Sequence, residues 1–190
     1  MKSPQENKER FLSIVRDNVQ RDGVEDLLQF LEESDFYTAP ASTKFNGSYD
    51  GGLVEHSLNV YDEMKRILTA YPEINVQNDS LAIVTLFHDL CKVNTYAKEK
   101  RNRKNHSGQW ESYDAYTYSE KFSYGSHGGK SVFMVNAFMH LNPDEAVAIN
   151  CHMGFSDVQN GQAVGAAFTQ FPIAWLLHVA DESATFIVEK

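Results

Sequence analysis

Residues that can bind metal ions are spread along most of this 190-residue chain. Of its 7 histidines, five stand where an expected helix begins, ends or turns a polar edge towards its apolar body. One histidine on an apolar helix is most often a structural side chain, so none of the five identifies a site alone. More informative is the order of four of them together with two aspartates. That series is His56, His88, Asp89, His127, His152 and Asp181.

Four local motifs give this series a resemblance to a known superfamily. The motifs are GGLVEHS over residues 51–57, LFHDLCK over 86–92, YGSHGGKS over 124–131 and CHMG over 151–154. Together they resemble the HD-domain superfamily of metal-dependent phosphohydrolases, in its variant with two extra histidines for a second metal. The likeness covers nearly all of residues 51–189. The inserted hairpin ahead of the His127 turn makes the chain similar to a bacterial and phage subgroup, which is related to the HD module of a bacterial exoribonuclease. Ser126 stands where this subgroup usually has glycine.

The resemblance implies one or two bound divalent transition metals as cofactor. Imidazole and carboxylate ligands suit Mn, Fe, Co, Ni or Zn better than Mg or Ca, which prefer all-oxygen shells. Asp89 has two carboxylate oxygens and is the expected bridge between the ions. Two ions about 3.5–4 Å apart activate a shared water, so no protein nucleophile or base is needed. Metal one would take His56, His88, Asp89 and Asp181, and metal two would take Asp89, His127 and His152.

Two lysines are expected to act with Asp89 in catalysis. Lys92 lies four residues after His88 and three after Asp89, so on a helix it would share their face and hold a substrate phosphate. The alternative is a lysine that only interacts with the helix dipole. Lys130, three residues after His127, resembles a second phosphate contact.

Three further side chains near the motifs have less specific roles. Cys91 and Cys151 lie in apolar stretches, and two thiols cannot form a disulfide framework or a four-thiolate zinc site. We expect both to be buried, reduced packing residues. His178, three residues before Asp181, either orients that carboxylate or packs in the interior.

Helices are expected to position these residues. Apolar side chains three to four apart, with Gly, Pro and Asn breaks, predict an all-α fold with a small inserted β-hairpin. The resemblance implies that this fold is an HD-domain helical bundle. We expect one domain over 1–190, with a helical scaffold (1–36), a metal-site core (51–189) and the hairpin insertion (96–124). Helices are predicted over residues 53–70, 132–139 and 172–188. A further helix, capped by Asp79 or Ser80, should reach residue 90, and another should begin at residue 143. A loop is predicted around Gly161 and Gly165.

The insertion combines a basic stretch, residues 98–104, with a turn at 105–108 and a following series of aromatic residues that begins at Trp110. Positive charge with interleaved rings is typical of a single-strand binding surface, on which bases stack. The other interpretation, which we favour, is a lid whose aromatic side chains pack on the helical body.

Composition excludes several classes of protein. Lys+Arg 17 against Asp+Glu 26 gives a net charge of −9, which disfavours duplex DNA as a partner because such binding needs cations to neutralise phosphates. No apolar run reaches the roughly 18–20 residues of a membrane span, and the first ten residues resemble no secretory signal. We therefore expect a cytoplasmic protein with no membrane partner.

The function expected from the sequence is metal-dependent hydrolysis of a phosphomonoester or phosphodiester. The substrate would be a small phosphorylated molecule, a nucleotide or a short single-stranded oligonucleotide. Two alternatives stay open: a regulatory module that binds metal and nucleotide without turnover, and a single-strand exonuclease. The sequence leaves the oligomeric state, the metal and the substrate undetermined.

Overall fold

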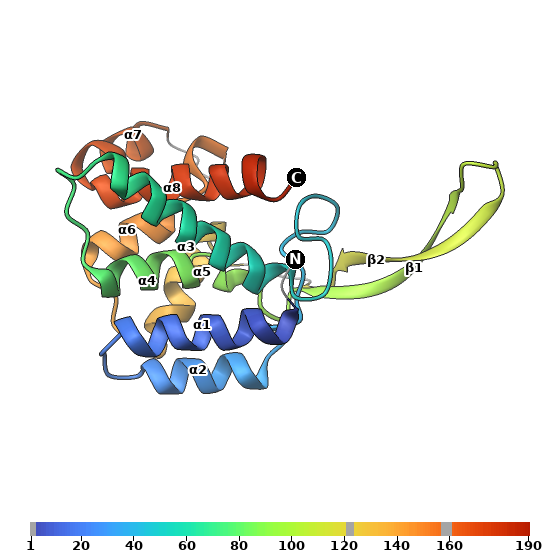
Figure 1. Cartoon of the computed structure of the whole chain (residues 1–190), viewed down its shortest axis with the longest axis horizontal. Coiled ribbons are helices and arrows are strands. Elements are labelled where there is room, and N and C mark those ends of the chain that lie inside the picture. The colour runs from blue at the N-terminus through green and yellow to red at the C-terminus, as the bar shows by residue number, and fades with distance from the viewer. Residues whose placement is uncertain (1–2, 121–123, 157–160) are drawn as a thin grey trace.

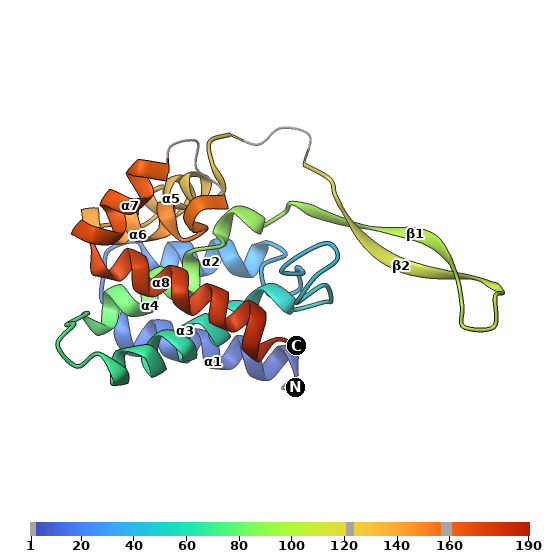
Figure 2. The same ribbon diagram turned by 90° about the horizontal axis from the view of Figure 1, so that it is seen from above.

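Helices form the body of the protein, and two strands leave it as a projecting arm (Figures 1 and 2). The computed structural model describes residues 3–120, 124–156 and 161–190. The helices are α1 (Pro4–Asn18), α2 (Val24–Glu33), α3 (Gly52–Ala70), α4 (Asn78–Phe87), α5 (His127–Asn136), α6 (Pro143–Cys151), α7 (Gly161–Gln170) and α8 (Pro172–Ser183). Three short turns, η1 (Leu90–Lys92), η2 (Gly154–Ser156) and η3 (Ala184–Val188), complete the body. The predicted helical fold with one small β-hairpin is confirmed.

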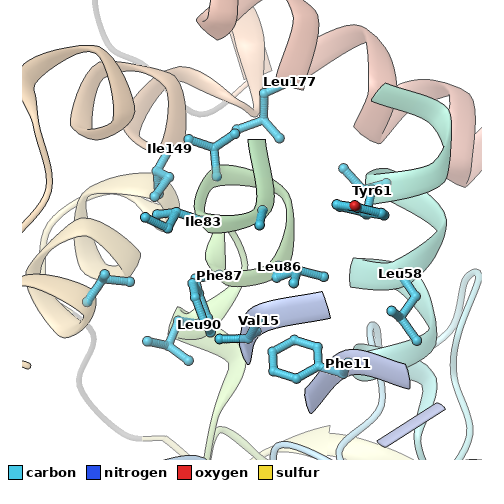
Figure 3. Close-up of a cluster of buried hydrophobic side chains, with 14 of the residues drawn as sticks. Phe11, Val15, Leu58, Tyr61, Ile83, Leu86, Phe87, Leu90, Ile149 and Leu177 are labelled. Carbon is cyan, nitrogen blue, oxygen red and sulfur yellow. The ribbon is translucent and has the colours of Figure 1, made fainter. Parts of the chain in front are cut away.

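The core surrounds α4, whose residues from Ser80 to Phe87 are all buried. Helix α3 packs on α4 and α8, α6 packs on α4 and α8, and α1 covers α3 and α4. The rings of Phe11 and Phe87 meet edge to face with centroids 5.8 Å apart, within the cluster that Figure 3 shows. A helix that is apolar all round belongs in the interior. The end of α4, where His88 and Asp89 follow, is therefore held inside the body.

Helix ends agree with the sequence at some positions and differ at others. Asn142 caps α6 through a reciprocal capping box with Glu145, as its sequence predicts. The predicted cap of α4 at Asp79 or Ser80 is wrong, because the helix begins at Asn78. Asp79 instead accepts a hydrogen bond from Arg21 Nη2 at 2.7 Å, so an ion pair outcompetes the capping role.

Two C-terminal predictions also need correction. Residues 161–170, predicted as a loop around Gly161 and Gly165, form α7, which packs on α8 through buried Val164 and Ala167. The last helix, predicted to reach Val188, ends at Ser183 and continues as the wider turn η3. Tertiary packing overrides the low helix propensity of glycine in the first case.

The hairpin consists of β1 (Tyr96–Lys104) and β2 (Trp110–Tyr118), paired antiparallel from Tyr96 with Tyr118 to Lys104 with Trp110. It extends away from the helices in both views (Figures 1 and 2). Trp110 is 70% exposed. The aromatic side chains contact cations of the hairpin itself, as Lys104 lies over Trp110 at 5.6 Å and Arg103 over Tyr113 at 4.8 Å. The outer part of the hairpin therefore does not pack on the body as the favoured lid interpretation requires, whereas at its root Tyr116 donates a hydrogen bond to Asp50 of the body.

Among the described residues, no helix by itself has the length and apolar character to cross a membrane. One pair, α7 with the segment Pro172–Val188, reaches these criteria jointly, with a 111° bend between its parts.

Candidate metal centre

The six residues of the predicted ligand series meet at one place in the body. His56 comes from α3, His88 and Asp89 follow α4, and Asp181 lies on α8. His127 is the first residue of α5, and His152 follows the last residue of α6. Rings lie side by side with centroids 5.3 Å apart for His56 and His88, 4.9 Å for His88 and His152, and 5.5 Å for His152 and His127.

His88 and Asp89 do not lie on one helix, which differs from the expectation. The α-helix ends at Phe87, and Asp89 takes φ −101° and ψ 20° before η1 begins. This conformation belongs to the sparsely populated bridge region, which many active-site residues adopt. The break lets both side chains face one point, whereas on a continuous helix they would diverge by about 100°.

Two of the four imidazoles are anchored by backbone carbonyls. His88 Nδ1 donates to Thr85 O at 2.8 Å, and His152 Nδ1 donates to Ile149 O at 2.6 Å. Each bond fixes the tautomer and leaves the Nε2 lone pair as an acceptor. Neither Nε2 atom has a hydrogen-bond partner among the described residues, although both side chains are 0% exposed. Burying such an atom unpaired costs about 1–3 kcal/mol, and a neutral imidazole nitrogen is the commonest metal ligand in proteins.

The carboxylate of Asp89 separates the histidines into two pairs. Its Oδ2 lies 3.6 Å from His56 Nε2 and 3.5 Å from His88 Nε2. Its Oδ1 lies 2.7 Å from His127 Nε2 and 3.6 Å from His152 Nε2. The two oxygens of one buried carboxylate thus face two separate groups of donors, as a bridge between two ions requires.

A close approach of two helices brings the second pair together. Ser126 caps α5 by accepting from Gly129 N at 3.0 Å, so this serine has a structural role at the start of the helix. A Cβ atom on Gly128 would lie 2.4 Å from Ile149 O, so only glycine fits there. His127 and His152 therefore reach the same carboxylate oxygen.

Glu189 is part of this centre, and the sequence analysis did not identify it. It lies 133 residues from His56, yet its Oε1 accepts from His56 Nδ1 at 2.9 Å and from Asn59 Nδ2 at 3.0 Å. His56 Nε2 lies 3.1 Å from Asp181 Oδ1. A carboxylate behind a metal-binding histidine orients the ring and strengthens it as a ligand. A near-terminal glutamate carries no spacing signal that would have revealed this role.

Burial and charge shift the pKa values of the centre in opposite directions. Burial disfavours the charged form of His56, but its hydrogen bonds to Asp181 and Glu189 outweigh burial and raise its pKa to about 10. Asp89 and Cys91 likewise overcome burial and raise the pKa of His127 to about 10. For His88 burial prevails and lowers the pKa to about 4.

The carboxylates of the centre are held ionised. Burial alone would raise the pKa of Asp89, but the nearby Lys92 ammonium and the imidazoles hold it well below its usual range. The hydrogen bond from His56 similarly keeps the pKa of Asp181 low against the effect of burial. The donor set at neutral pH therefore includes anionic oxygen and, at His88, neutral nitrogen, which suits a divalent transition metal.

The structure brings only one of the two predicted lysines to this cluster. Lys92 Nζ lies 2.5 Å from Asp89 Oδ2. Lys130 Nζ instead pairs with Glu120 Oε1, and the side chain is buried. This ion pair occupies the Lys130 ammonium, and its predicted phosphate contact stays a prediction. His178 does not contact Asp181, because its Nδ1 donates to His152 O at 2.7 Å and supports the turn after α6.

A pocket of about 230 Å³ opens onto the first group of donors. His56, Asp89, Lys92 and Asp181 line it together with Glu182 and Glu189, and Phe45 and Phe186 also line it. Larger hollows of about 570 Å³ and 470 Å³ lie elsewhere, and their linings contain no member of the six-residue series. We take the smaller pocket as the candidate site because the donors converge there.

Comparison of this chain with protein-family models, with curated proteins and with solved structures found no match. The geometry alone therefore carries the description of the centre. Buried groups of His, Asp and Cys within 4.8 Å of one another can hold a metal ion: His56 with His88 and Asp181, His88 with Asp89 and His152, and Asp89 with Cys91 and His127.

Proposed function

We propose that this protein is a metal-dependent phosphohydrolase of the HD type, which cleaves a phosphoester of a nucleotide or short oligonucleotide. The observation that carries the proposal is the pair of buried, unpartnered Nε2 atoms of His88 and His152, on either side of the Asp89 carboxylate. A fully buried nitrogen without a partner is rare in native proteins and calls for a ligand. A divalent ion at each carboxylate oxygen satisfies both imidazoles.

The charge of the pocket supports the same conclusion. Four carboxylates line it, those of Asp89, Asp181, Glu182 and Glu189. Against them the described lining has two cations, the Lys92 ammonium and the His56 imidazole, whose pKa is raised to about 10. A phosphate would be repelled by this lining unless additional positive charge were bound there. Metal ions on the His and Asp donors supply that charge, so cation and anionic substrate bind together.

When bound, one or two divalent ions would supply an activated water and polarise a phosphoryl oxygen. His56, His88, Asp89 and Asp181 would hold the first ion, and Asp89, His127 and His152 the second. Glu189 orients His56, and the carbonyls of Thr85 and Ile149 orient His88 and His152. Lys92 pairs with Asp89 and lies on the pocket wall, from which its ammonium can bind a non-bridging phosphoryl oxygen.

The mouth of the pocket favours a substrate with an aromatic group. Phe45 is 81% exposed and Phe186 is 59% exposed, and both line the pocket. Their segments are tied together, since Asn46 Nδ2 donates to Thr185 O. Exposed rings beside a phosphate site can stack on a nucleobase, which contributes about 1–3 kcal/mol per base.

A short oligonucleotide is the second candidate substrate, and the charge of the β1–β2 arm supports it. Residues 96–118 carry five Lys and Arg against three Asp and Glu, in a chain of net charge −9. Its root adjoins the centre, because Tyr96 follows Lys92 by four residues. Lys98 also pairs with Asp50 at 2.7 Å, just before α3. A strand bound along the arm would lead towards the pocket.

The proposal is tested by assaying the purified protein with Mn against phosphomonoesters, nucleoside triphosphates, cyclic dinucleotides and short RNA. We expect hydrolysis of at least one class that stops with a chelator and returns with metal. Tight binding of nucleotide without turnover of any class would instead indicate a regulatory module.

The oligonucleotide candidate has its own test, a variant with Lys100, Arg101 and Arg103 replaced by Ala. If the arm binds a strand, cleavage of short RNA falls, and the loss shrinks as salt rises because screened phosphate contacts contribute less. Hydrolysis of a small chromogenic phosphoester serves as the control and stays unchanged. Equal rates of the variant and the wild type on RNA at low salt would rule out the arm as a strand-binding surface.

A further inference from the structure

We propose that the thiolate of Cys91 is a ligand of the second metal position, which makes that position selective for zinc or another thiophilic divalent ion. The inference rests on the proposed function only in its assignment of a second metal position beside Asp89 Oδ1. It adds a residue that the ligand series does not contain. Cys91 is free and buried, as the sequence predicts, and the proposal gives its thiol a role in addition to packing.

The position of the sulfur carries the inference. Cys91 Sγ lies 3.3 Å from His127 Nε2, and His127 Nε2 lies 2.7 Å from Asp89 Oδ1. The three ligand atoms of Asp89, Cys91 and His127 all lie within 4.8 Å of one another. Zinc bonds of about 2.0–2.3 Å in a tetrahedral arrangement place ligand atoms about 3.3–3.7 Å apart. The sulfur–nitrogen separation of 3.3 Å lies at the short end of that range, and an ion would replace the 2.7 Å contact between His127 Nε2 and Asp89 Oδ1.

The backbone holds this thiol in place. Cys91 lies in η1, and its N–H donates to Ser131 Oγ of α5 at 3.0 Å. The side chain is 5% exposed, so it cannot turn out to solvent without moving η1. A ligand fixed by its own backbone loses little conformational entropy when the ion binds.

A second, independent observation points to an ion at the same place. His152 is 0% exposed, its Nε2 has no hydrogen-bond partner among the described residues, and that atom lies 3.6 Å from Asp89 Oδ1. His152 Nε2 lies within 4.8 Å of donors of His88 and Asp89, and it shares Asp89 with the separate group of Asp89, Cys91 and His127. A shift of the His152 ring towards Cys91 would bring two nitrogens, one oxygen and one sulfur to one ion. Four donors are the number that zinc takes in closed sites, and an ion here would satisfy the buried imidazole.

The two metal positions then differ in the kind of ion they select. The donors of the first position, His56, His88, Asp89 and Asp181, offer only nitrogen and oxygen. A thiolate ligand at the second position favours Zn or Fe over Mn and Mg, which prefer oxygen ligands. We therefore expect the protein to hold a sulfur-bound zinc at the second position while the first position exchanges with Mn in solution.

Cys151 provides a matched control within the same chain. It is also buried, at 7% exposed, and it immediately precedes His152. Its sulfur contacts Asn150 Nδ2 at 3.8 Å and belongs to none of the candidate metal clusters formed by the described residues. Replacing it tests whether any buried thiol near the centre would give the same result.

The experiment loads the wild type, Cys91→Ser and Cys151→Ser with zinc and records X-ray absorption at the zinc edge. The wild type and Cys151→Ser should show a zinc–sulfur distance of about 2.3 Å, and Cys91→Ser should show only nitrogen and oxygen. Competition with a chromogenic chelator should show that Cys91→Ser holds its second zinc at least about 10-fold more weakly, since even the loss of a supporting partner costs about 10–100-fold.

Zinc bound only by nitrogen and oxygen in the wild type would overturn the assignment, as would a sulfur signal that persists in Cys91→Ser. The wild-type spectrum decides the question even if Cys91→Ser fails to fold. The result is also separable from the proposed function. A zinc–sulfur bond in a protein that hydrolyses no phosphoester retains Cys91 as a ligand and rejects the activity, and hydrolysis with sulfur-free zinc does the reverse.

Discussion

The metal centre and the β1–β2 arm use charged side chains in opposite ways. In the centre, Asp89 is almost fully buried, and its carboxylate contacts His127 of α5 and Lys92 of η1. In the arm, Lys100 and Asp114 pair at 2.7 Å while 71% and 60% exposed. Exposed pairs contribute about 0–1 kcal/mol, whereas the loss of one partner from a buried pair costs about 3–5 kcal/mol. Substitutions should therefore have large effects in the centre and small effects in the arm.

The largest expected effect is that of Asp89→Ala. The change removes the proposed bridge and leaves Lys92 and His127 without their carboxylate partner. We expect activity to fall by about 10³-fold or more, as for other groups that act as a unit, and metal to be lost from both positions. His152→Ala should empty mainly the second position, as elemental analysis can measure. Equal and small effects of the two substitutions would contradict the bridging role, and Asp89→Asn controls for misfolding.

A smaller loss is expected for Glu189→Gln. The amide keeps the size of the side chain but removes the negative charge that His56 Nδ1 contacts at 2.9 Å. Metal affinity should fall by about 10–100-fold, as is typical when a partner behind a metal-binding histidine is lost. Titration with a fluorescent metal indicator measures it. Glu182→Gln is the matched control, since Glu182 lines the same pocket but is exposed, and an equal loss there would reject the specific role of Glu189.

Metal binding should tighten as pH rises. The pKa values of His56 and His127 are raised to about 10 in the metal-free chain, so each imidazole holds a proton at neutral pH that an ion must displace. Affinity should increase by up to about tenfold per pH unit for each proton displaced. Calorimetry in buffers of different ionisation enthalpy counts those protons, and binding without proton release between about pH 7 and 9 would contradict the expectation.

The raised pKa values of His56 and His127 make the metal-free fold less stable as pH rises, whereas metal binding becomes tighter. Both folded-state pKa values lie above the ordinary value of 6.5, so the stabilisation they provide is complete below about pH 6.5. It is lost as pH rises through about 10. Thermal unfolding of chelator-treated protein should therefore occur at lower temperature at pH 9 than at pH 7 if these groups dominate.

The smallest effect should come from Trp110→Ala in the arm. Trp110 is 70% exposed and contacts Lys104 of the neighbouring strand. The free energy of unfolding should change by no more than about 0.5 kcal/mol, as for surface substitutions in general, whereas a lid packed on the body would lose several times more. Chemical denaturation measures the difference. Phe11→Ala in the core, expected to cost about 3–5 kcal/mol, shows that the assay detects a packing loss.

The two regions also differ in how far the sequence could predict them. The order of histidines and aspartates, with the motifs around them, pointed to six side chains that lie close together in the structure. The sequence could not reveal the break after Phe87, since helix ends depend on packing around α4 rather than on local propensity. Glu189 carried no signal because its partner is 133 residues away.

The arm shows a different limit. Alternation and turn residues predicted a hairpin within residues 96–124, but they cannot tell whether its rings face the body or solvent. Aromatic rings of the hairpin contact cations of the same hairpin, as Arg103 does over Tyr113, so these rings have partners without packing on the body. The Glu120 partner of Lys130 was out of reach for a related reason, because spacing from His127 predicts a helical face but not the side chain that meets it.

The most direct test of the central claim is the metal content of the wild-type protein purified without chelator. We predict at least one equivalent of transition metal per chain by elemental analysis. We also predict a rise in unfolding temperature when Mn, Ni or Zn is added to the stripped protein, because an ion that binds only the folded state stabilises it by mass action. Absence of metal together with no thermal shift for any of the three ions would contradict the account.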